Sequence, residues 1–286
     1  MIERIAILGT GLLGTSAGLG LRKAGFRGSI TGWNRSAEGA QIARTMGAFD
    51  RVASDPIELA RGSQLILLAT PVHAILDWME RLAGALDSDQ LVTDVGSTKL
   101  QITEAGNRLF NQPGRAAFLP GHPMAGKERG GAALGDADLY RGAVWLFTDS
   151  PVIRRSPEAD ALVKSWRDWV EAMGSRIIDL DPARHDELVA WVSHLPQFVA
   201  TGLSALLEEQ VGDAPELKDV GGRALREMTR LGSSPYSMWR DIAHTNVDAI
   251  ARALAALELH LAHIRENLRT PGLREEFDKA NRFRKE

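Results

Sequence analysis

The chain has no cysteine among its 286 residues, no excess of positive charge and no long apolar run. Without cysteine it can form neither a disulfide nor a thiolate zinc site and offers no cysteine nucleophile; we predict no bound metal. The 34 basic and 37 acidic side chains sum to −3, which excludes the basic fields that bind nucleic acid or a membrane surface. No apolar stretch approaches the ~20 residues of a membrane-spanning helix.

The composition is that of an ordinary globular protein. Apolar residues make up 44% and charged residues 25% of the chain, and such a chain can bury a full core without disulfides. Met1 leads directly into an apolar strand pattern, so we expect no signal peptide and a cytoplasmic location. The length fits two domains of roughly 150 residues each.

The first part of the chain alternates between short apolar runs and longer mixed segments. Four runs have the character of buried strands: Ile5–Leu8, Ser29–Trp33, Gln64–Ala69 and Gln90–Thr93. Buried strands that alternate with helices form parallel sheets. Two further strands are predicted at Ala143–Phe147 and Arg176–Ile178, and a helix over Ser156–Met173 is predicted to cover the sheet.

The pattern changes after Asp181 and Pro182, a helix N-cap followed by a residue that suits the first helical turn. No strand is predicted beyond this point. Long helices are expected over Leu188–Leu207, which is apolar on most sides, and over Asn246–Ile264. Residues 274–286 are charged and predict a solvated helix or a frayed end.

We therefore predict a Rossmann-like α/β nucleotide-binding domain over residues 1–182, followed by an all-α substrate and dimerisation domain over residues 183–286. A long apolar helix in so small a helical domain needs more cover than the domain supplies. Either the bundle closes on itself or the helix lies at a dimer interface. Soluble proteins commonly form two-fold dimers, which favours a homodimer through the helical domain.

A glycine motif follows the first predicted strand and precedes a helix. Gly9, Gly11 and Gly14 stand in a GxGxxG pattern, with Leu12 and Leu13 between the last two. The glycines allow a tight turn, close approach of a pyrophosphate, and packing of helix on strand. The free N–H groups of the helix then bind the phosphates. The alternative, a plain structural turn, is less compatible with this context, and we predict a dinucleotide cofactor.

The end of the second strand bears on which dinucleotide binds. An Asp or Glu there would bind the ribose 2′-hydroxyl of NAD, but the chain has Asn34, Arg35 and Ser36. All three can donate to a 2′-phosphate, Arg with two parallel bonds. We predict NADP. The alternative is NAD, with Arg35 simply exposed and Ser36 capping the next helix.

Three more stretches lie where ligands bind in α/β sheets, at the carboxyl ends of strands. Thr70 and Pro71 follow one strand and are predicted to contact the cofactor; Ser97 follows the next. His122 lies between two prolines, in what we predict to be a rigid loop, and is suited to acid/base catalysis. It is otherwise a surface histidine. Ser97 caps a helix beginning at Thr98, hydrogen-bonds the reacting group, or does both.

Five motifs in order carry a specific resemblance: GTGLLG, DVGSTK, GHPMAG, SHLPQ (Ser193–Gln197) and TRLGSSPYSMWRDI (Thr229–Ile242). With them the chain resembles the prephenate/arogenate dehydrogenase family of tyrosine biosynthesis. The resemblance implies a nucleotide-binding α/β domain followed by a helical dimerisation domain. It also implies NAD(P)-dependent oxidative decarboxylation of a cyclohexadienol to an aromatic product.

The resemblance assigns roles to individual residues. His122 would polarise or deprotonate the ring 4-hydroxyl, Ser97 would hydrogen-bond the hydroxyl or the histidine, and Arg230 would bind a substrate carboxylate. A bidentate guanidinium suits a carboxylate in any case. From the residues alone, Arg223 and Arg226 are equal rivals, and the motif selects Arg230.

The SHLPQ stretch adds two candidates for substrate binding. His194 lies in an apolar helix and is either a core residue or part of the site. Gln197, three positions on, shares its helical face. Many prephenate-using members have a histidine where this chain has Gln197, so the glutamine leaves the choice between prephenate and arogenate open. His185 is expected on the opposite side from His194, with a structural role only.

Two other functions have a similar fold. A β-hydroxyacid dehydrogenase or imine reductase would use a lysine on the long helix, but Leu188–Leu207 contains none. A non-enzymatic nucleotide sensor would not need His122, Ser97 and Arg230 together. Only a short tail follows the helical domain, so we expect neither an appended regulatory domain nor a fused mutase.

Overall fold

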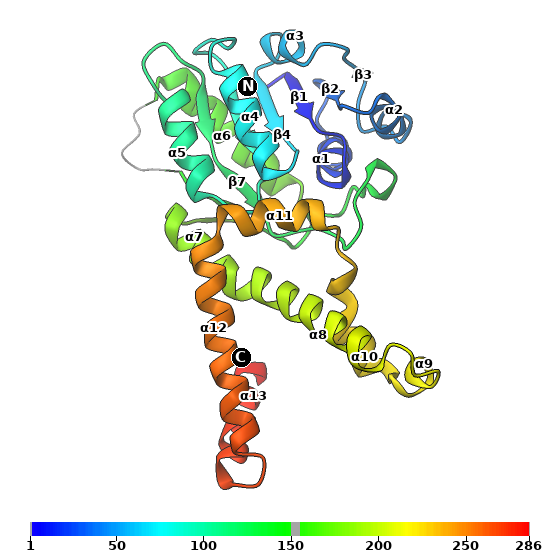
Figure 1. Ribbon diagram of the computed structural model, residues 1–286. Coiled ribbons are helices and arrows are strands. Elements are labelled where there is room, and N and C mark those ends of the chain that lie inside the picture. The colour runs from blue at the N-terminus through cyan, green and yellow to red at the C-terminus, as the bar shows by residue number, and fades with distance from the viewer. Residues whose placement is uncertain (1, 150–154, 286) are drawn as a thin grey trace.

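The computed structural model describes residues 2–149 and 155–285, in which a helical region extends away from an α/β domain (Figure 1). A six-stranded parallel sheet with the order β3-β2-β1-β4-β5-β6 forms the centre of that domain. Its strands are β1 Arg4–Leu8, β2 Ser29–Trp33, β3 Arg51–Val52, β4 Leu65–Leu68, β5 Leu91–Asp94 and β6 Ala117–Leu119. The four strands predicted for this part of the chain are confirmed, whereas the short β3 and β6 were not predicted.

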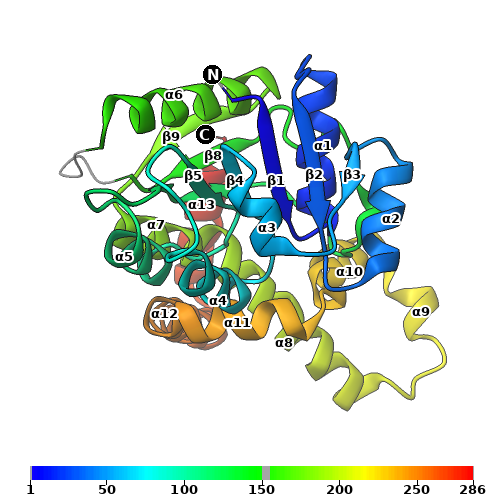
Figure 2. The ribbon, with the colours of Figure 1, turned by 90° about the horizontal axis from the view of Figure 1, so that it is seen from above.

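Helices cover both faces of the sheet (Figure 2). They are α1 Leu12–Lys23, α2 Ala37–Thr45, α3 Pro56–Arg61, α4 Val72–Leu82, α5 Leu100–Leu109 and α6 Pro157–Ala172. Helices α1, α2 and α6 pack on one face, and α3, α4 and α5 on the other. Since alternate side chains of a strand point to opposite faces, each central strand contributes to both cores.

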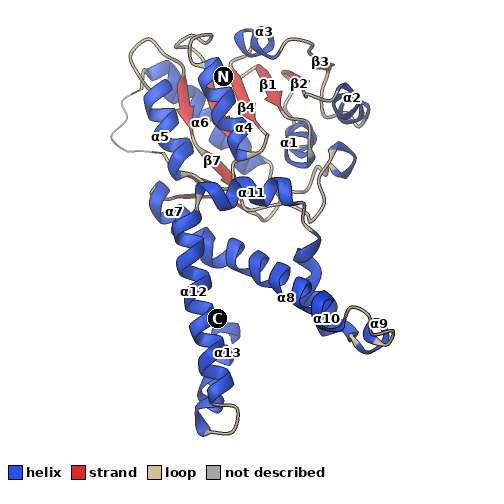
Figure 3. Cartoon of the chain, viewed as in Figure 1, coloured by secondary structure: helices blue, strands red, loops and turns tan. Residues whose placement is uncertain are grey.

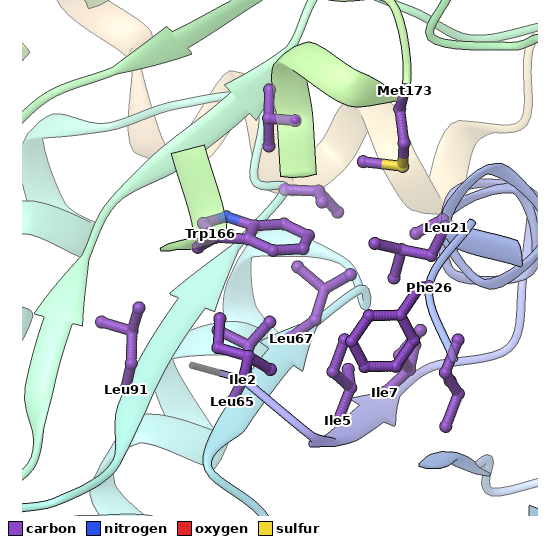
Figure 4. Close-up of a cluster of buried hydrophobic side chains, with 14 of the residues drawn as sticks. Ile2, Ile5, Ile7, Leu21, Phe26, Leu65, Leu67, Leu91, Trp166 and Met173 are labelled. Atoms are coloured by element: carbon purple, nitrogen blue, oxygen red, sulfur yellow. The ribbon is translucent and has the colours of Figure 1, made fainter. Parts of the chain in front are cut away.

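The core under α6 shows this alternation (Figure 4). Ile5 and Ile7 of β1 pack there together with Trp166 of α6, while Ala6 and Leu8 lie in the core on the other face. The helix predicted over Ser156–Met173 therefore covers the sheet, as expected.

A second, three-stranded sheet follows. It consists of β7 Gly121–Pro123, β8 Val144–Phe147 and β9 Arg176–Asp179, with β7 antiparallel to β8 and β8 parallel to β9. The two later strands were predicted, but the loop predicted around His122 is wrong. His122 is the middle residue of β7 and pairs with Leu146. Pro120 before the strand and Pro123 at its end predict a loop, because proline has no N–H to donate to a sheet. The strand forms nevertheless, since its partner β8 lies more than twenty residues further along the chain.

The helical region begins as predicted. Asp181 caps α7 (Pro182–Val189), and its side chain accepts hydrogen bonds from the backbone N–H groups of Ala183 and Arg184. The helix predicted over Leu188–Leu207 is confirmed in that every residue is helical, but it is not one regular α-helix. Ala190–His194 forms a π-helical turn, and α8 (Leu195–Val211) begins only after it, with Pro196 in its first turn.

The remaining helices complete this region. They are α9 Leu217–Val220, α10 Gly222–Thr229, a 3₁₀ turn at Arg230–Ser233, α11 Tyr236–Thr245, α12 Val247–Glu266 and α13 Pro271–Lys285. The charged tail forms a helix, one of the two predicted alternatives. Helices α12 and α13 lie side by side and project away from the α/β domain (Figure 3).

The core of the helical region is small. One cluster of buried apolar residues consists of Ala190, Ile242, Ala249 and Ile250, with Phe198 and Trp239 packed against them. Val189, Ala200 and Ala253 are also buried. Large apolar side chains remain exposed in this region, among them Trp191, Val192, Leu206, Leu259, Leu261, Leu268, Phe277 and Phe283. No helix in residues 2–149 and 155–285 is long and apolar enough to span a bilayer.

Candidate active site

The glycine loop has the geometry of a phosphate cradle. Gly9 has a φ of +106°, and a Cβ added there would lie 2.2 Å from the carbonyl oxygen of Ala69. A Cβ on Gly14 would lie 1.9 Å from the carbonyl oxygen of Gly9, whereas one on Gly11 would meet no atom within 4 Å. Two glycines are therefore required by packing, and the third faces open space. Gly11 is the N-cap of α1, and no described side chain caps this helix. The backbone N–H groups of its first turn therefore stay available for an anion.

Two buried hydroxyls belong to this region, one within the glycine loop and one after β4. Among the described residues, the buried Oγ1 atoms of Thr10 and Thr70 have no hydrogen-bond partner. Thr70 follows β4, and Pro71 caps α4. Buried polar atoms normally have partners, and a ligand with polar groups would supply them here. The residues present thus fit a dinucleotide.

The end of β2 is open and free of carboxylates. Ser36 caps α2, since its Oγ accepts a hydrogen bond from the N–H of Gly39 at 3.3 Å. The Asn34 amide donates to the carbonyl of Ser36 at 3.4 Å, and the Arg35 side chain is exposed. The capping alternative for Ser36 is therefore present in the structure, but it leaves the Ser36 O–H free to donate.

His122 lies within a chain of three buried side chains. Its Nδ1 is 2.8 Å from Nε2 of His185, and Nδ1 of His185 is 2.8 Å from Oδ1 of Asp186. Burial is the main cause that lowers the pKa of His122 well below 6.5, and the neighbouring His185 and Lys99 lower it further. His122 is consequently neutral at pH 7 and can accept a proton.

The expectation that His185 lies opposite His194 is wrong. The two histidines are close enough for His185 to lower the pKa of His194, and both are buried. The prediction assumed 3.6 residues per turn, and the π-helical turn at Ala190–His194 breaks that periodicity. No sequence pattern predicts such a turn. The burial of His185 and Asp186 could not be predicted either, although a histidine next to an aspartate is rarely buried without a functional or structural reason.

A buried ion pair holds the strand that carries His122. The Nζ of Lys99 donates to Oδ2 of Asp94, and both side chains have no exposed surface. Asp94 Oδ1 accepts from the N–H of Gly121 at 3.0 Å, while Lys99 donates to the Gly121 carbonyl at 2.7 Å. The pair therefore grips both backbone groups of the residue before His122. Sequence reasoning found this motif but not its function.

Ser97 is not the cap of a helix beginning at Thr98. Helix α5 begins at Leu100, and the carboxylate of Asp186 accepts hydrogen bonds from the N–H groups of Lys99 at 2.7 Å and Leu100 at 3.0 Å. A residue of the helical region thus does the capping. Ser97 is half-buried at the end of β5, and its hydroxyl is not needed by this helix.

His194 and Gln197 have local partners. Burial lowers the pKa of His194 to about 4, and its ring packs edge-on against Trp239 with centroids 5.9 Å apart. The Gln197 amide donates to the carbonyl of Leu231 at 2.7 Å, and its oxygen accepts from Ser234 at 3.1 Å. Gln197 therefore holds the turn that contains Arg230.

Arg230 reaches across to the α/β domain. Its guanidinium forms an ion pair with Glu128, in the segment that follows β7, although 61% of its side chain is exposed. Of its two rivals, Arg223 pairs with Glu227 on its own helix, and Arg226 is exposed. Within the described residues, Arg230 is the one of the three that pairs with the domain that carries His122.

Two family models together match almost the whole chain. One, for the prephenate dehydrogenase nucleotide-binding domain, matches residues 17–178, and the other, for the prephenate dehydrogenase dimerization domain, matches residues 181–282. The chain belongs to the prephenate dehydrogenase family.

Individual members show the same relationship. The prephenate dehydrogenase of Lactococcus lactis subsp. cremoris is 30% identical over 267 residues, which cover 92% of this chain and 70% of that protein. Prephenate dehydrogenase from A. aeolicus, crystallised with hydroxyphenyl propionate and NAD+, matches with a TM-score of 0.84 and 27% identity, covering 100% and 96% of the two chains. Synechocystis arogenate dehydrogenase matches with a TM-score of 0.77 and 28% identity, covering 99% of each chain.

Several motif residues of this prephenate dehydrogenase family member lie at one edge of the sheet. The glycine loop, Thr70 and Ser97 follow β1, β4 and β5, and His122 lies just beyond β6. Gln197 and Arg230 come together at a turn of the helical region, where Gln197 donates to Leu231.

Proposed function

We propose that this protein catalyses the NAD(P)-dependent oxidative decarboxylation of prephenate, arogenate or both, giving 4-hydroxyphenylpyruvate or tyrosine. The observation that carries the proposal is a buried, neutral His122 whose Nε2 is not used by the His185 contact. It lies at the edge of the sheet that carries the phosphate cradle. A proton acceptor beside a dinucleotide site suits dehydrogenation of an alcohol.

The residues divide the chemistry between them. His122 Nε2 accepts the proton of the ring 4-hydroxyl, and Ser97 donates a hydrogen bond that orients this hydroxyl. The bound dinucleotide supplies the acceptor for the hydride that leaves the same ring carbon. As the ring carboxylate departs as carbon dioxide, the electron pair of its bond completes the aromatic ring. Formation of the aromatic ring supplies much of the favourable free energy of the reaction. The protein therefore mainly orients the substrate and the dinucleotide and accepts one proton.

The test is nicotinamide reduction, followed by absorbance, with prephenate, arogenate and a set of β-hydroxyacids, each with NAD and with NADP. We expect turnover with at least one cyclohexadienol and none with the β-hydroxyacids. Activity confined to the β-hydroxyacids would contradict the proposal.

Asn34, Arg35 and Ser36 are proposed to favour NADP. Asn34→Asp should shift the preference toward NAD, because a carboxylate repels the 2′-phosphate and accepts a hydrogen bond from the free 2′-hydroxyl. The measurement is kcat/KM for both cofactors in wild type and variant, with Glu38→Gln, in the first turn of α2, as a nearby charge control. A wild type that prefers NAD tenfold or more contradicts this proposal.

Arg230 is proposed to bind a substrate carboxylate. Arg230→Ala should mainly raise KM, since the ion pair exists in both ground and transition states. Truncating one partner of a buried charge pair costs ~2–5 kcal/mol. Because 61% of the Arg230 side chain is exposed, solvent screening should keep the effect at or below the lower value. Arg226→Ala is the matched control, because this exposed arginine lies one helical turn away. Should Arg226→Ala raise KM and Arg230→Ala not, the assignment is wrong.

Gln197 is proposed to allow good use of arogenate. A protonated histidine would repel the arogenate ammonium group, whereas glutamine is neutral and offers an acceptor. Gln197→His should therefore move the ratio of kcat/KM toward prephenate. The alternative is that its bonds to Leu231 and Ser234 are its whole role. An unchanged ratio, or a wild type inactive on arogenate, favours that alternative.

A homodimer through the helical region is part of the proposal. The matching family model describes a dimerization domain, and the small core and exposed apolar side chains of these helices support it. The cytoplasmic location stays a prediction from sequence.

A further inference from the structure

His122 is connected across the domain boundary to two groups that the proposed reaction does not touch. His185 and Asp186 belong to α7, while His122 belongs to β7, and the side chains form a continuous hydrogen-bonded chain. All three residues are buried: His122 is 8%, His185 0% and Asp186 4% exposed. A buried chain of this kind fixes where each proton lies, because water cannot supply alternative partners.

The proton positions follow from the acceptor end. The Asp186 carboxylate already accepts from two backbone N–H groups at the start of α5, and as an ionised group it can only accept. Nδ1 of His185 must therefore carry the proton in its 2.8 Å contact with Asp186. Burial lowers the pKa of His185, so this ring is neutral and its Nε2 has a lone pair.

The same reasoning then fixes His122. Since Nε2 of His185 is an acceptor, Nδ1 of His122 must donate in the 2.8 Å contact. A neutral imidazole has one protonated nitrogen, which leaves Nε2 of His122 with its lone pair. In the opposite arrangement Nε2 would carry a proton and could not take one from a hydroxyl group. The chain thus selects the tautomer that can act as a base.

The other charged neighbours do not compete for these positions. Lys99 is bound to Asp94 and the Gly121 carbonyl. His194 contributes to lowering the pKa of His122, but its hydrogen-bond contact is with Asn246. The charge of Lys99 lowers the pKa values of both His122 and His185, and Asp94 raises that of His185. None of these groups hydrogen-bonds Nδ1 of His122 or Nε2 of His185 in the described part of the chain.

We propose that His185, held by Asp186, is a positioning residue that locks His122 in its Nδ1–H tautomer and aims Nε2 at the substrate hydroxyl. This inference rests on the proposed function. Capping of α5 explains why Asp186 bonds to the backbone. It does not explain why His185 is buried between Asp186 and His122. The partner on the second nitrogen of a histidine sets its tautomer, as it does in other acid/base sites.

The first experiment compares two substitutions of His185. His185→Gln keeps an acceptor atom near the former Nε2 position, whereas His185→Leu fills a similar volume without one. His185→Leu should lower kcat by ~10²-fold with little change in either KM, in the range that orienting partners contribute. His185→Gln should recover kcat to within about tenfold of wild type.

Thr245→Val is the matched control for a loosened domain contact. It removes a buried 2.7 Å hydrogen bond between Thr98 and Thr245 that also joins the two domains, but it leaves the histidine chain intact. Its kcat should stay near that of wild type. If His185→Leu and His185→Gln lose the same activity in proportion to lost thermal stability, His185 is only structural and the proposal is overturned.

The second experiment needs no turnover. Ring ¹⁵N shifts of labelled histidines, assigned by comparison with His122→Asn, report which nitrogen of His122 is protonated at pH 7. We expect Nδ1–H in the wild type and a mixture in His185→Leu. A wild type with Nε2–H overturns the proposal, even if His185→Leu does not fold. A wild type inactive on both cyclohexadienols would instead contradict the proposed function, and the ¹⁵N result would still decide the tautomer.

Discussion

Replacing His122 with asparagine should lower turnover by ~10²–10⁴-fold, the usual contribution of a positioned acid or base. Asparagine can keep a hydrogen bond toward His185 but has no nitrogen that takes up a proton. Because His122 lies away from the glycine loop in sequence and the loop is held by its own packing, cofactor affinity should stay nearly unchanged.

The measurements are kcat with the preferred substrate and the dissociation constant of the cofactor. His244→Asn, at an exposed histidine of α11, controls for the substitution itself. The pH profile gives an independent check. Burial lowers the pKa of His122 well below 6.5, so activity should be retained as pH falls through 6.5 and be lost only when the ring finally protonates. Turnover like the wild type's in His122→Asn would remove this histidine from the mechanism.

Replacing Lys99 with methionine should destabilise the fold by ~3–5 kcal/mol, the typical cost of leaving one member of a buried ion pair without its partner. Asp94 has no exposed side-chain surface and would remain as an uncompensated charge. The Gly121 carbonyl would lose its donor as well. The free energy of unfolding from urea titration is the measurement.

Two further variants make this result specific. Lys164→Met breaks an exposed pair with Asp168, and surface pairs contribute at most ~1 kcal/mol. The double variant Lys99→Met/Asp94→Asn removes the stranded charge and should recover part of the loss. Equal costs for Lys99→Met and Lys164→Met would show that the buried pair is not important for stability.

Much of the α/β domain could be predicted because its signals are local. The strand β1, the turn at Gly9 and the start of α1 lie within a few residues of one another, and the cap at Asp181 acts on its own helix. Such patterns report backbone requirements that hold wherever the rest of the chain goes.

The contacts that build the candidate site are not local. His122 and His185 are 63 residues apart in sequence, and Asp186 and Lys99 are 87 apart. Regular helical spacing predicted that His185 lies opposite His194, because it takes no account of the π-helical turn between them. The sequence motif that contains Lys99 does not show that this lysine binds the carbonyl of Gly121. Side-chain type could indicate chemistry at these positions, but only the tertiary structure pairs them.

The cap that Asp186 places on α5 has a consequence for folding. The first turn of this helix takes two hydrogen bonds from the helical region, and loss of such a cap costs ~0.5–2 kcal/mol. The ion pair of Arg230 with Glu128 and the Thr98–Thr245 bond join the same two regions. The α/β domain is thus incomplete alone, and both regions should melt in a single cooperative transition. The division near residue 182 separates two architectures but not two independent units of stability.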